Sequence, residues 1–205
     1  MDASDWDARY AASDLVWSAT PNQWVTELLG ELTPGRAVDI AAGEGRNAIW
    51  LAERGWTVRA LDFSAVAVDR IRALASRRLE GAAGSLEAEV ADATGPVPGG
   101  PDAYDLVLFS YLQLPEDDWV RALRAGVEAA APGGLVVVIA HARANLDGGW
   151  GGPRDPRVLH DPDDLVAQCA GLPVAVETAR LATRVVETED GPREALDTIG
   201  ILRRT

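Results

Sequence analysis

Two acids flank a glycine-rich turn early in the chain, and their spacing is typical of a nucleotide-binding unit. Asp39 lies within an apolar run, Gly43 and Gly45 follow it, and Asp62 ends the next apolar run. Glycines allow the backbone to turn sharply and to approach a ligand closely, and a helix that begins there directs its N-terminus at the ligand. A carboxylate at the tip of the second strand is placed to accept hydrogen bonds from ribose hydroxyls. Residues 37–64 are therefore expected to form a strand–helix–strand unit that binds a nucleotide.

The glycine spacing fits the dinucleotide-binding fingerprint G-x-G-x-x-A. Gly43, Gly45 and Ala48 supply its three small residues, and Asp62 follows at close to the roughly 20-residue spacing of that fingerprint. An NAD-dependent oxidoreductase is therefore one open interpretation of these residues. The chain contains no lysine, however, so it has no Tyr-x-x-x-Lys pair.

The same stretch resembles motif I of the class I S-adenosylmethionine (SAM) dependent methyltransferases, which usually reads D-x-G-x-G-x-G. In this chain Asp39 is followed by I-A-A-G-E-G, so Ala41 stands where the first glycine is usual. Residues 86–90 predict a third strand, and Asp92 follows it at a position that resembles the adenine contact of the family. The apolar run 104–110 predicts a parallel strand buried on both faces.

The C-terminal part of the chain predicts a pair of strands joined by a tight turn. Residues 174–187 and 194–203 are separated by Asp-Gly-Pro at 190–192, and a P-G-G turn precedes an apolar run at 135–140. A terminal hairpin resembles strands 6 and 7 of the methyltransferase sheet, whereas a dinucleotide fold more often continues with strand–helix units. We therefore expect an α/β, Rossmann-like doubly wound sheet of seven strands, mostly parallel, with a C-terminal antiparallel hairpin and helices on both faces.

Further motifs resemble the small tellurite-resistance (TehB-like) and thiopurine methyltransferases. They are G-E-G-R-N at 43–47, W-D-x-R-Y at 6–10, and Trp17, and the resemblance covers roughly residues 4–203. It implies SAM as the cofactor, S-adenosylhomocysteine as its product, and in-line displacement at a sulfonium methyl, for which the protein mainly supplies alignment. Because Ala41 departs from the motif, a non-catalytic SAM-binding protein stays open as an alternative.

The resemblance also implies which residues hold the cofactor. Gly43 and Gly45 would pass beneath the methionine part of SAM, and Asp39 would fix that loop or take the amino group. Asp62 would bind both ribose hydroxyls as a charge-assisted pair, and Phe63 would lie beside the adenine. The expected cofactor-binding residues are Tyr10, Trp17, Asp39, Ala41, Gly43, Gly45, Asn47, Asp62, Phe63, Ser64, Asp92, Ala93 and Ser110.

Candidate residues for the transfer itself follow the fourth and fifth strands. His141 ends strand 5 and Tyr111 follows strand 4, so either is a candidate to take a proton from a hydroxyl or amine acceptor. A thiol or a reduced selenium or tellurium species would need no strong base. Arg46 is a candidate contact for the SAM carboxylate or an anionic substrate. Trp150, within the Gly/Pro-rich segment 142–160, is a candidate substrate contact.

The length of 205 residues predicts a single domain, 1–205, with N-terminal lid helices at 1–33 and a substrate-side loop at 142–160. Thr20-Pro21 predicts a helix start, with Thr20 as the N-cap.

Composition narrows the class of partner. The formal net charge of −13 disfavours binding to nucleic acid or to an anionic membrane, because phosphates require clustered cations. Cys169 is the only cysteine, so no internal disulfide is possible. No metal-ligand cluster, signal peptide or membrane-spanning run stands out. We expect a cytoplasmic monomer or homodimer that acts on a small-molecule substrate and holds no metal.

Overall fold

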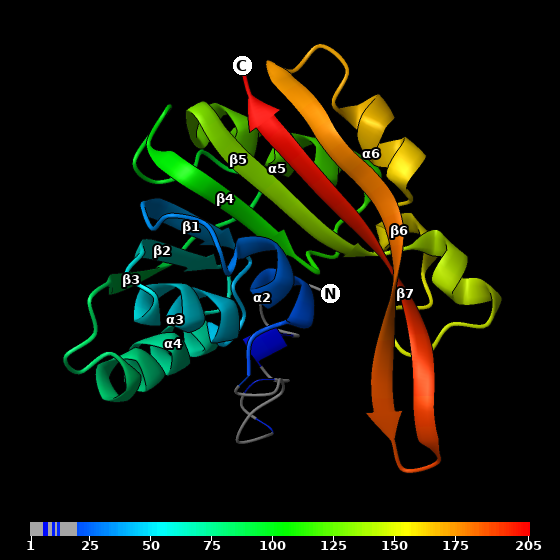
Figure 1. The fold of residues 1–205 in the computed structure, drawn as a ribbon, viewed down its shortest axis with the longest axis horizontal. Helices are drawn as coiled ribbons and strands as arrows, with labels where there is room; N and C mark the ends of the chain where they lie inside the picture. The colour runs from blue at the N-terminus through cyan, green and yellow to red at the C-terminus, as the bar shows by residue number, and fades with distance from the viewer. Residues whose placement is uncertain (1–5, 8–9, 11, 13–19) are drawn as a thin grey trace.

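The computed structural model describes residues 6, 7, 10, 12 and 20–205 (Figure 1). Its strands are β1 (Arg36–Ile40), β2 (Thr57–Asp62), β3 (Ser85–Val90), β4 (Tyr104–Ser110), β5 (Ala130–His141), β6 (Val174–Thr188) and β7 (Gly191–Arg204). They form one sheet in the order β3-β2-β1-β4-β5-β7-β6. The pairs from β3 to β5 are parallel, whereas β7 lies antiparallel between β5 and β6. The expected seven-stranded sheet with a C-terminal antiparallel hairpin is confirmed.

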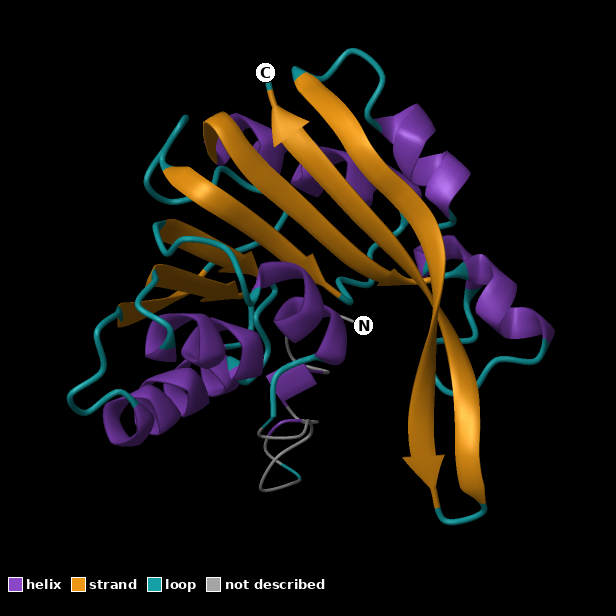
Figure 2. Cartoon of the chain, in the orientation of Figure 1, coloured by secondary structure: helices purple, strands orange, loops and turns teal. Residues whose placement is uncertain are grey.

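Helices cover both faces of this sheet, as expected (Figure 2). They are α2 (Gln23–Leu29), α3 (Arg46–Glu53), α4 (Ala65–Arg78), α5 (Glu116–Ala129) and α6 (Pro162–Gln168). The first three pack on one face, and α5 and α6 pack on the other. Alternate residues of β1 separate the two cores, because Ala37 faces the first group while Val38 and Ile40 face the second. None of the helices in the described residues has the length and apolar character to cross a membrane.

Large aromatic side chains hold the helices on the sheet. Trp24, Trp50 and Trp56 are buried in the core beneath α2 and α3. On the other face, Trp119 of α5 meets Phe109 of β4 edge-on, with ring centroids 5.4 Å apart. Each such side chain buries about 150–250 Å², so these contacts fix on the sheet the helices that begin at its carboxyl edge, such as α3 and α5.

The β6–β7 hairpin is the longest element of the fold and projects beyond the parallel strands (Figure 1). Its register brings Asp197 of β7 opposite His141, the last residue of β5. Arg184 of β6 lies opposite Ala195, which is two residues before Asp197 in β7. The antiparallel hairpin therefore carries charged side chains to the edge of the sheet at which the parallel strands end.

The first helix of the continuous part of the structure begins later than the sequence predicts. Asn22, and not Thr20, caps α2, because its Oδ1 accepts a hydrogen bond from the Trp24 amide at 2.8 Å. The Asn22 amide in turn donates to Oδ1 of Asn47 at 2.9 Å. This tertiary contact holds Asn22 at the helix start, so the local Thr-Pro signal does not decide the boundary.

Gly45 is the position in the glycine turn where packing and backbone both require glycine. Its φ is +81°, and a Cβ there would meet Cγ1 of Ile71 at 2.9 Å. Gly100 has a similar φ of +78° but open space around it. We expect Gly100→Ala to lower the free energy of unfolding by about 1 kcal/mol from backbone strain alone. Gly45→Ala should lower it by about 2–4 kcal/mol, because overpacking adds to that strain.

Urea unfolding of the two variants beside the parent chain measures this difference. Equal destabilisation by the two substitutions would show that Ile71 moves aside freely, and that the contact between α4 and the turn does not constrain residue 45.

Candidate active site

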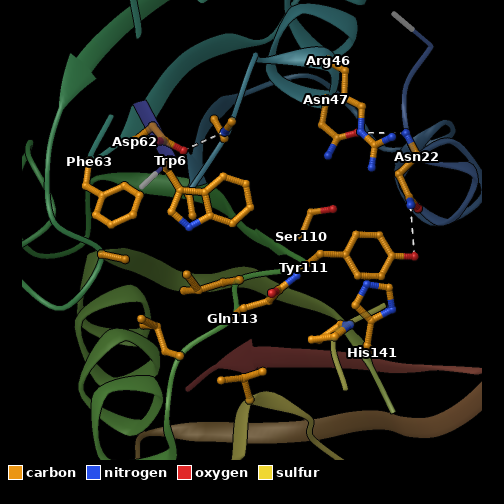
Figure 3. Close-up of a pocket in the computed structure, with 18 of the residues that line it drawn as sticks. Trp6, Asn22, Arg46, Asn47, Asp62, Phe63, Ser110, Tyr111, Gln113 and His141 are labelled. Atoms are coloured by element: carbon orange, nitrogen blue, oxygen red, sulfur yellow. Dashed lines mark hydrogen bonds between the residues drawn. The ribbon is translucent and has the colours of Figure 1, made fainter. Parts of the chain in front are cut away.

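A cavity of about 530 Å³ lies at the carboxyl ends of the parallel strands, where open α/β sheets bind their ligands (Figure 3). Most of the site residues expected from the sequence line it. They are Tyr10, Ala41, Gly43, Arg46, Asn47, Asp62, Phe63, Asp92, Ala93, Ser110, Tyr111 and His141. Asp39, Gly45, Ser64 and Trp150 do not line the cavity, and Trp17 lies outside the described residues.

The backbone of the glycine turn explains the residue types found there. Ala41, Gly43 and Gly45 have φ values of 60°, 57° and 81°, all in the left-handed region that favours glycine. Ala41 thus takes the conformation that the usual glycine of this motif would allow, at a cost of about 1 kcal/mol. Alanine therefore replaces the usual glycine at this position, but the backbone keeps the conformation that permits a close approach to a ligand.

Asp62 is the buried acid at the tip of β2. Its Oδ2 accepts a hydrogen bond from the Gly43 amide at 2.8 Å, and its Oδ1 accepts one from the Ser64 amide at 3.0 Å. Burial raises the pKa of the Asp62 carboxyl, and the two backbone amides oppose that shift. The glycine turn and the tip of β2 are therefore joined through one carboxylate, which faces the cavity beside Phe63 (Figure 3).

Asp39 lies beneath the glycine turn and is 1% exposed. Neither of its carboxylate oxygens has a hydrogen-bond partner among the described residues, although the Ala48 amide lies near enough to lower its pKa slightly. Burial raises the pKa of Asp39 to about 7, and the positive charge of Arg46 opposes the rise. An unpartnered buried acid at this place fits SAM, because the ammonium and sulfonium groups of that cofactor would stabilise its charged form.

Two aromatic residues near the N-terminus contribute to the wall of the cavity (Figure 3). Trp6 and Tyr10 line it, with their ring centroids 5.6 Å apart. Asp7 accepts a short hydrogen bond from the Ser64 hydroxyl at the start of α4. Ser64, expected to contact the cofactor, does not line the cavity, and its hydroxyl is engaged by Asp7 and caps α4 through the Ala67 amide.

Asp92 and Ser110 both line the cavity, but they differ in whether their polar atoms already have hydrogen-bond partners. Oδ1 of the exposed Asp92 accepts hydrogen bonds from both the amide and the hydroxyl of Thr94, each at 2.8 Å. One carboxylate oxygen is therefore already engaged within the turn. The hydroxyl of Ser110 is buried and has no partner among the described residues, so it remains for a ligand.

A fully buried carboxylate, Asp197, organises the end of the cavity away from Asp62. Its Oδ2 accepts hydrogen bonds from Trp24 Nε1 (2.9 Å), Tyr111 Oη (2.8 Å) and Arg184 Nε (2.9 Å). Nδ1 of His141 lies 3.4 Å from Oδ1, close enough for an ion pair but without good hydrogen-bond geometry. Burial alone would raise the pKa of Asp197, but His141, Arg184 and Trp24 together lower it to about 2.

Tyr111 is a hydrogen-bond donor and a packing partner in this cluster. Its φ is +60°, its ring stacks on His141 with centroids 4.4 Å apart, and its hydroxyl also accepts from Asn22 Nδ2 at 3.2 Å (Figure 3). Burial, followed by the charge of Asp197, raises the pKa of the Tyr111 hydroxyl well above its usual value. The geometry does not support Tyr111 as a proton acceptor, because its own proton is held by Asp197.

Arg46 and Asn47 begin α3 and face the cavity from the side of the glycine turn. Asn47 uses its Oδ1 to hold the Asn22 amide, so at least that atom serves the fold. Burial lowers the pKa of Arg46, and the nearby Arg184 lowers it further. An anionic ligand beside Arg46 would relieve both effects.

Trp150, a candidate substrate contact, does not line the cavity. Its indole is 44% exposed, and the guanidinium of Arg193 lies over it at 5.8 Å. The Trp150 amide donates to the Glu194 carbonyl at 2.7 Å, and this contact with β7 turns the side chain away from the cavity.

The segment 142–160 is also more ordered than its composition indicates. It contains two short 3₁₀ helices, η1 (Arg143–Asp147) and η2 (Pro156–Val158). The buried Asn145 binds the Gly151 carbonyl through Nδ2 (2.9 Å) and the Leu196 amide through Oδ1 (2.8 Å). The part that lines the cavity consists of Pro153, Arg154, Asp155 and Val158.

Sequence reasoning missed Asp197, Arg184, Asn22 and Trp6. One signal for Asp197 was present, because an acid interrupts the apolar run A-L-D-T-I-G-I-L of β7. Buried acids in such a run are paired. Its partners lie on four other elements, however, so the pattern alone does not identify them.

The buried charge of Asp39 predicts a pH-dependent stability. The pKa is near 7 in the folded protein and near 3.8 in the unfolded chain, so between these pH values folding takes up a proton. The stabilisation is complete below the unfolded value and is lost as pH rises through the folded value, by up to about 4 kcal/mol. Asp39→Asn removes this titration. From pH 4 to pH 8 without SAM, the parent should therefore lose several kcal/mol relative to the variant in urea unfolding. Parallel pH profiles would show that Asp39 stays charged throughout.

Comparison with known proteins agrees with this geometry. The family described as "Methyltransferase domain" matches residues 37–134, which run from β1 to the start of β5. A structure described as "Conversion of a Disulfide Bond into a Thioacetal Group during Echinomycin Biosynthesis" is similar, with 22% identity and a TM-score of 0.75. It covers 98% of this chain and 92% of that chain.

Two further structures share the fold. TehB from Haemophilus influenzae is 13% identical with a TM-score of 0.70, covering 100% of this chain and 68% of that chain. The 1,6-didemethyltoxoflavin-N1-methyltransferase of Burkholderia thailandensis, with bound 1,6-didemethyltoxoflavin and S-adenosylhomocysteine, is 17% identical. Its TM-score is 0.66, and the match covers 99% of this chain and 87% of that chain.

The NAD-dependent alternative is set aside, because the sheet ends in the antiparallel hairpin of the methyltransferase fold and the matched family is a methyltransferase. Residues 37–134 match the methyltransferase domain and the whole chain has the fold of the similar structures, and together these findings support a SAM-dependent methyltransferase.

Proposed function

We propose that this enzyme transfers the methyl group of SAM to a small-molecule acceptor bound against His141. The observation that carries the proposal is the pair of His141 and the buried Asp197 at the acceptor end of the cavity. A carboxylate beside Nδ1 orients the imidazole and leaves Nε2 for a proton of the acceptor. The cavity volume of about 530 Å³ falls in the range of small-molecule sites, and the toxoflavin enzyme with this fold acts on a small molecule.

SAM, when bound, supplies a methyl group on a sulfonium whose loss leaves S-adenosylhomocysteine. His141 takes the proton that an acceptor hydroxyl or amine gives up as its oxygen or nitrogen bonds to the methyl carbon. Asp197 stabilises the imidazolium that results, because its charge is fixed by Arg184 and Trp24. Tyr111 keeps the imidazole in plane through the stacked contact at 4.4 Å.

The cofactor side of the proposal assigns roles to the two acids of the glycine motif. Asp62 receives the ribose hydroxyls, since its two oxygens are already oriented by the Gly43 and Ser64 amides. Asp39 stabilises the positive end of the methionine part from beneath the turn. Phe63 and Ala93 flank the adenine, and Trp6 and Tyr10 close over it.

We further propose a cytoplasmic monomer or homodimer that has no nucleic-acid partner. The net charge of −13 supports this, because phosphate backbones bind clustered cations on a surface. The single cysteine, Cys169, is buried and suits a reducing compartment.

The role of His141 predicts an acceptor-dependent loss of rate. With phenol or amine acceptors, His141→Gln should lower kcat by about 10²–10⁴, because the group that takes the acceptor proton is lost. With thiol acceptors, which need little base assistance, the loss should be less than about tenfold. His160→Gln is the matched control, because His160 stacks on Trp119 and does not line the cavity.

Initial rates from pH 6 to pH 9, with binding of S-adenosylhomocysteine as the test of folding, check this expectation. A His141→Gln enzyme that keeps the parent kcat with hydroxyl and amine acceptors across this range would exclude the imidazole as base.

The cofactor contacts predict graded losses of binding. Asp62→Ala removes a charge-assisted partner of two hydroxyls and should weaken SAM binding by about 10- to 100-fold. Asp92→Ala, at an exposed position already bonded to Thr94, should weaken it by less than about tenfold. Isothermal titration with SAM and S-adenosylhomocysteine measures both, and equal losses in the two variants would contradict the assignment of Asp62 to the ribose.

A further inference from the structure

We infer that the acceptor carries an anionic group, a carboxylate or a phosphate, which Arg184 and Arg154 bind beside His141. This inference rests on the proposed function, since it names the substrate class of the same cavity. It draws on three observations: the partly engaged guanidinium of Arg184, the gathering of arginines in the cavity, and the apolar surface around them.

Arg184 reaches the cavity from the β6 strand of the hairpin. Its Nε donates to Asp197 Oδ2 at 2.9 Å, and its guanidinium carbon lies 5.7 Å from the centre of the Tyr111 ring. A guanidinium has five N–H groups in a planar fork, of which Asp197 engages the one on Nε, and the hydroxyl of Tyr111 also interacts with this side chain. The remaining N–H groups suit a second, planar or tetrahedral oxyanion next to His141.

The cationic side chains in the cavity are concentrated in an otherwise acidic protein. Arg46, Arg154 and Arg184 all line it, whereas the net charge of the chain is −13. Arg184 lies near enough to Arg46 to lower the pKa of Arg46. The two positive charges repel each other, and an anion bound between or beside them would offset that repulsion.

The acidic side chains that line the cavity do not balance the arginines at this end. Asp62 and Asp92 belong to the ribose and adenine side. Asp155 lies in the same loop as Arg154, but it is paired with Arg157 at 2.7 Å. Asp197 does not itself line the cavity, and it is shared among four donors, so it is only partly available to Arg184.

The three arginines lie at different places in the cavity, so we assign them to different ligands. Figure 3 shows Arg46 with Asn47 at the start of α3, on the opposite side of the Tyr111 ring from His141. That position faces the glycine turn, so Arg46 suits the carboxylate of SAM. Arg184, from the hairpin, and Arg154, from the 142–160 segment, remain for the acceptor.

Apolar side chains complete the acceptor end. Leu112 and Leu114 follow β4, and Val158 lies on η2, and all three line the cavity with the arginines. The acceptor that fits these surfaces has an apolar or aromatic body, a nucleophile directed at His141 and an anionic group directed at Arg184. The carboxylate or phosphate anchors the body so that the nucleophile is aligned with the methyl carbon.

Binding to the complex with S-adenosylhomocysteine tests the inference. Benzoate, phenyl phosphate and benzamide share one aromatic body and differ in charge, so calorimetric titration of each separates the anion from the ring. We expect benzoate or phenyl phosphate to bind at least about tenfold more tightly than benzamide, and the tighter of the two distinguishes a carboxylate from a phosphate ligand.

Variants then assign the preference to particular residues. Arg154→Gln, at an exposed position, should lower the preference for the anion several-fold without affecting the fold. Arg184→Gln should abolish the preference, and Arg184→Lys should retain part of it. Arg193→Gln is the matched control, since it removes one positive charge from the same hairpin at an exposed position outside the cavity.

Three results would overturn the inference. The first is equal binding of benzoate, phenyl phosphate and benzamide, and the second is no binding of any of them at about 10 mM. The third is a preference for the anion that stays unchanged in both Arg154→Gln and Arg184→Gln. Titration of S-adenosylhomocysteine into every variant keeps this outcome separate from a failure of the proposed function, because loss of the anion preference leaves cofactor binding intact.

Discussion

The buried carboxylate of Asp197 is the contact on which the acceptor half of this enzyme depends. It joins α2 through Trp24, the end of β4 through Tyr111, the end of β5 through His141, and β6 through Arg184. A buried charge tolerates the loss of a partner poorly, at about 3–5 kcal/mol. The cluster therefore stabilises the hairpin against the parallel sheet and also sets the orientation of the imidazole proposed to take the acceptor proton.

The two acids of the glycine motif show how local environment separates similar side chains. Asp62 is held by two backbone amides and faces the cavity, whereas Asp39 lies one strand away without a hydrogen-bond partner among the described residues. The first is oriented before any ligand arrives. The second has a pKa of about 7 and gains its charge most readily beside a cation, so the site favours a positively charged cofactor without requiring a permanently exposed anion.

The sequence predicted the cofactor half of the site far better than the acceptor half. Gly43, Gly45 and Asp62 lie within one strand–helix–strand unit, so their relative positions follow from local spacing and from the geometry of parallel strands. Asp197 and Arg184 enter the site because β7 pairs with β5, and no short turn joins those two strands to set their register. Trp150 and Thr20 were misplaced for a related reason, because single contacts with Glu194 and Asn47 redirect the chain there.

This distribution of residues has an evolutionary consequence. The groups assigned to the cofactor come from the parallel strands and the N-terminal segment, whereas Arg184 and Asp197 come from a hairpin added at one edge of the sheet, and Arg154 comes from the segment tied to it. Substitutions in the hairpin and that segment can change which acceptor is chosen while the machinery for SAM stays intact. The residues proposed for the cofactor and those proposed for the acceptor thus come from different parts of the chain, which meet at the last residue of β5.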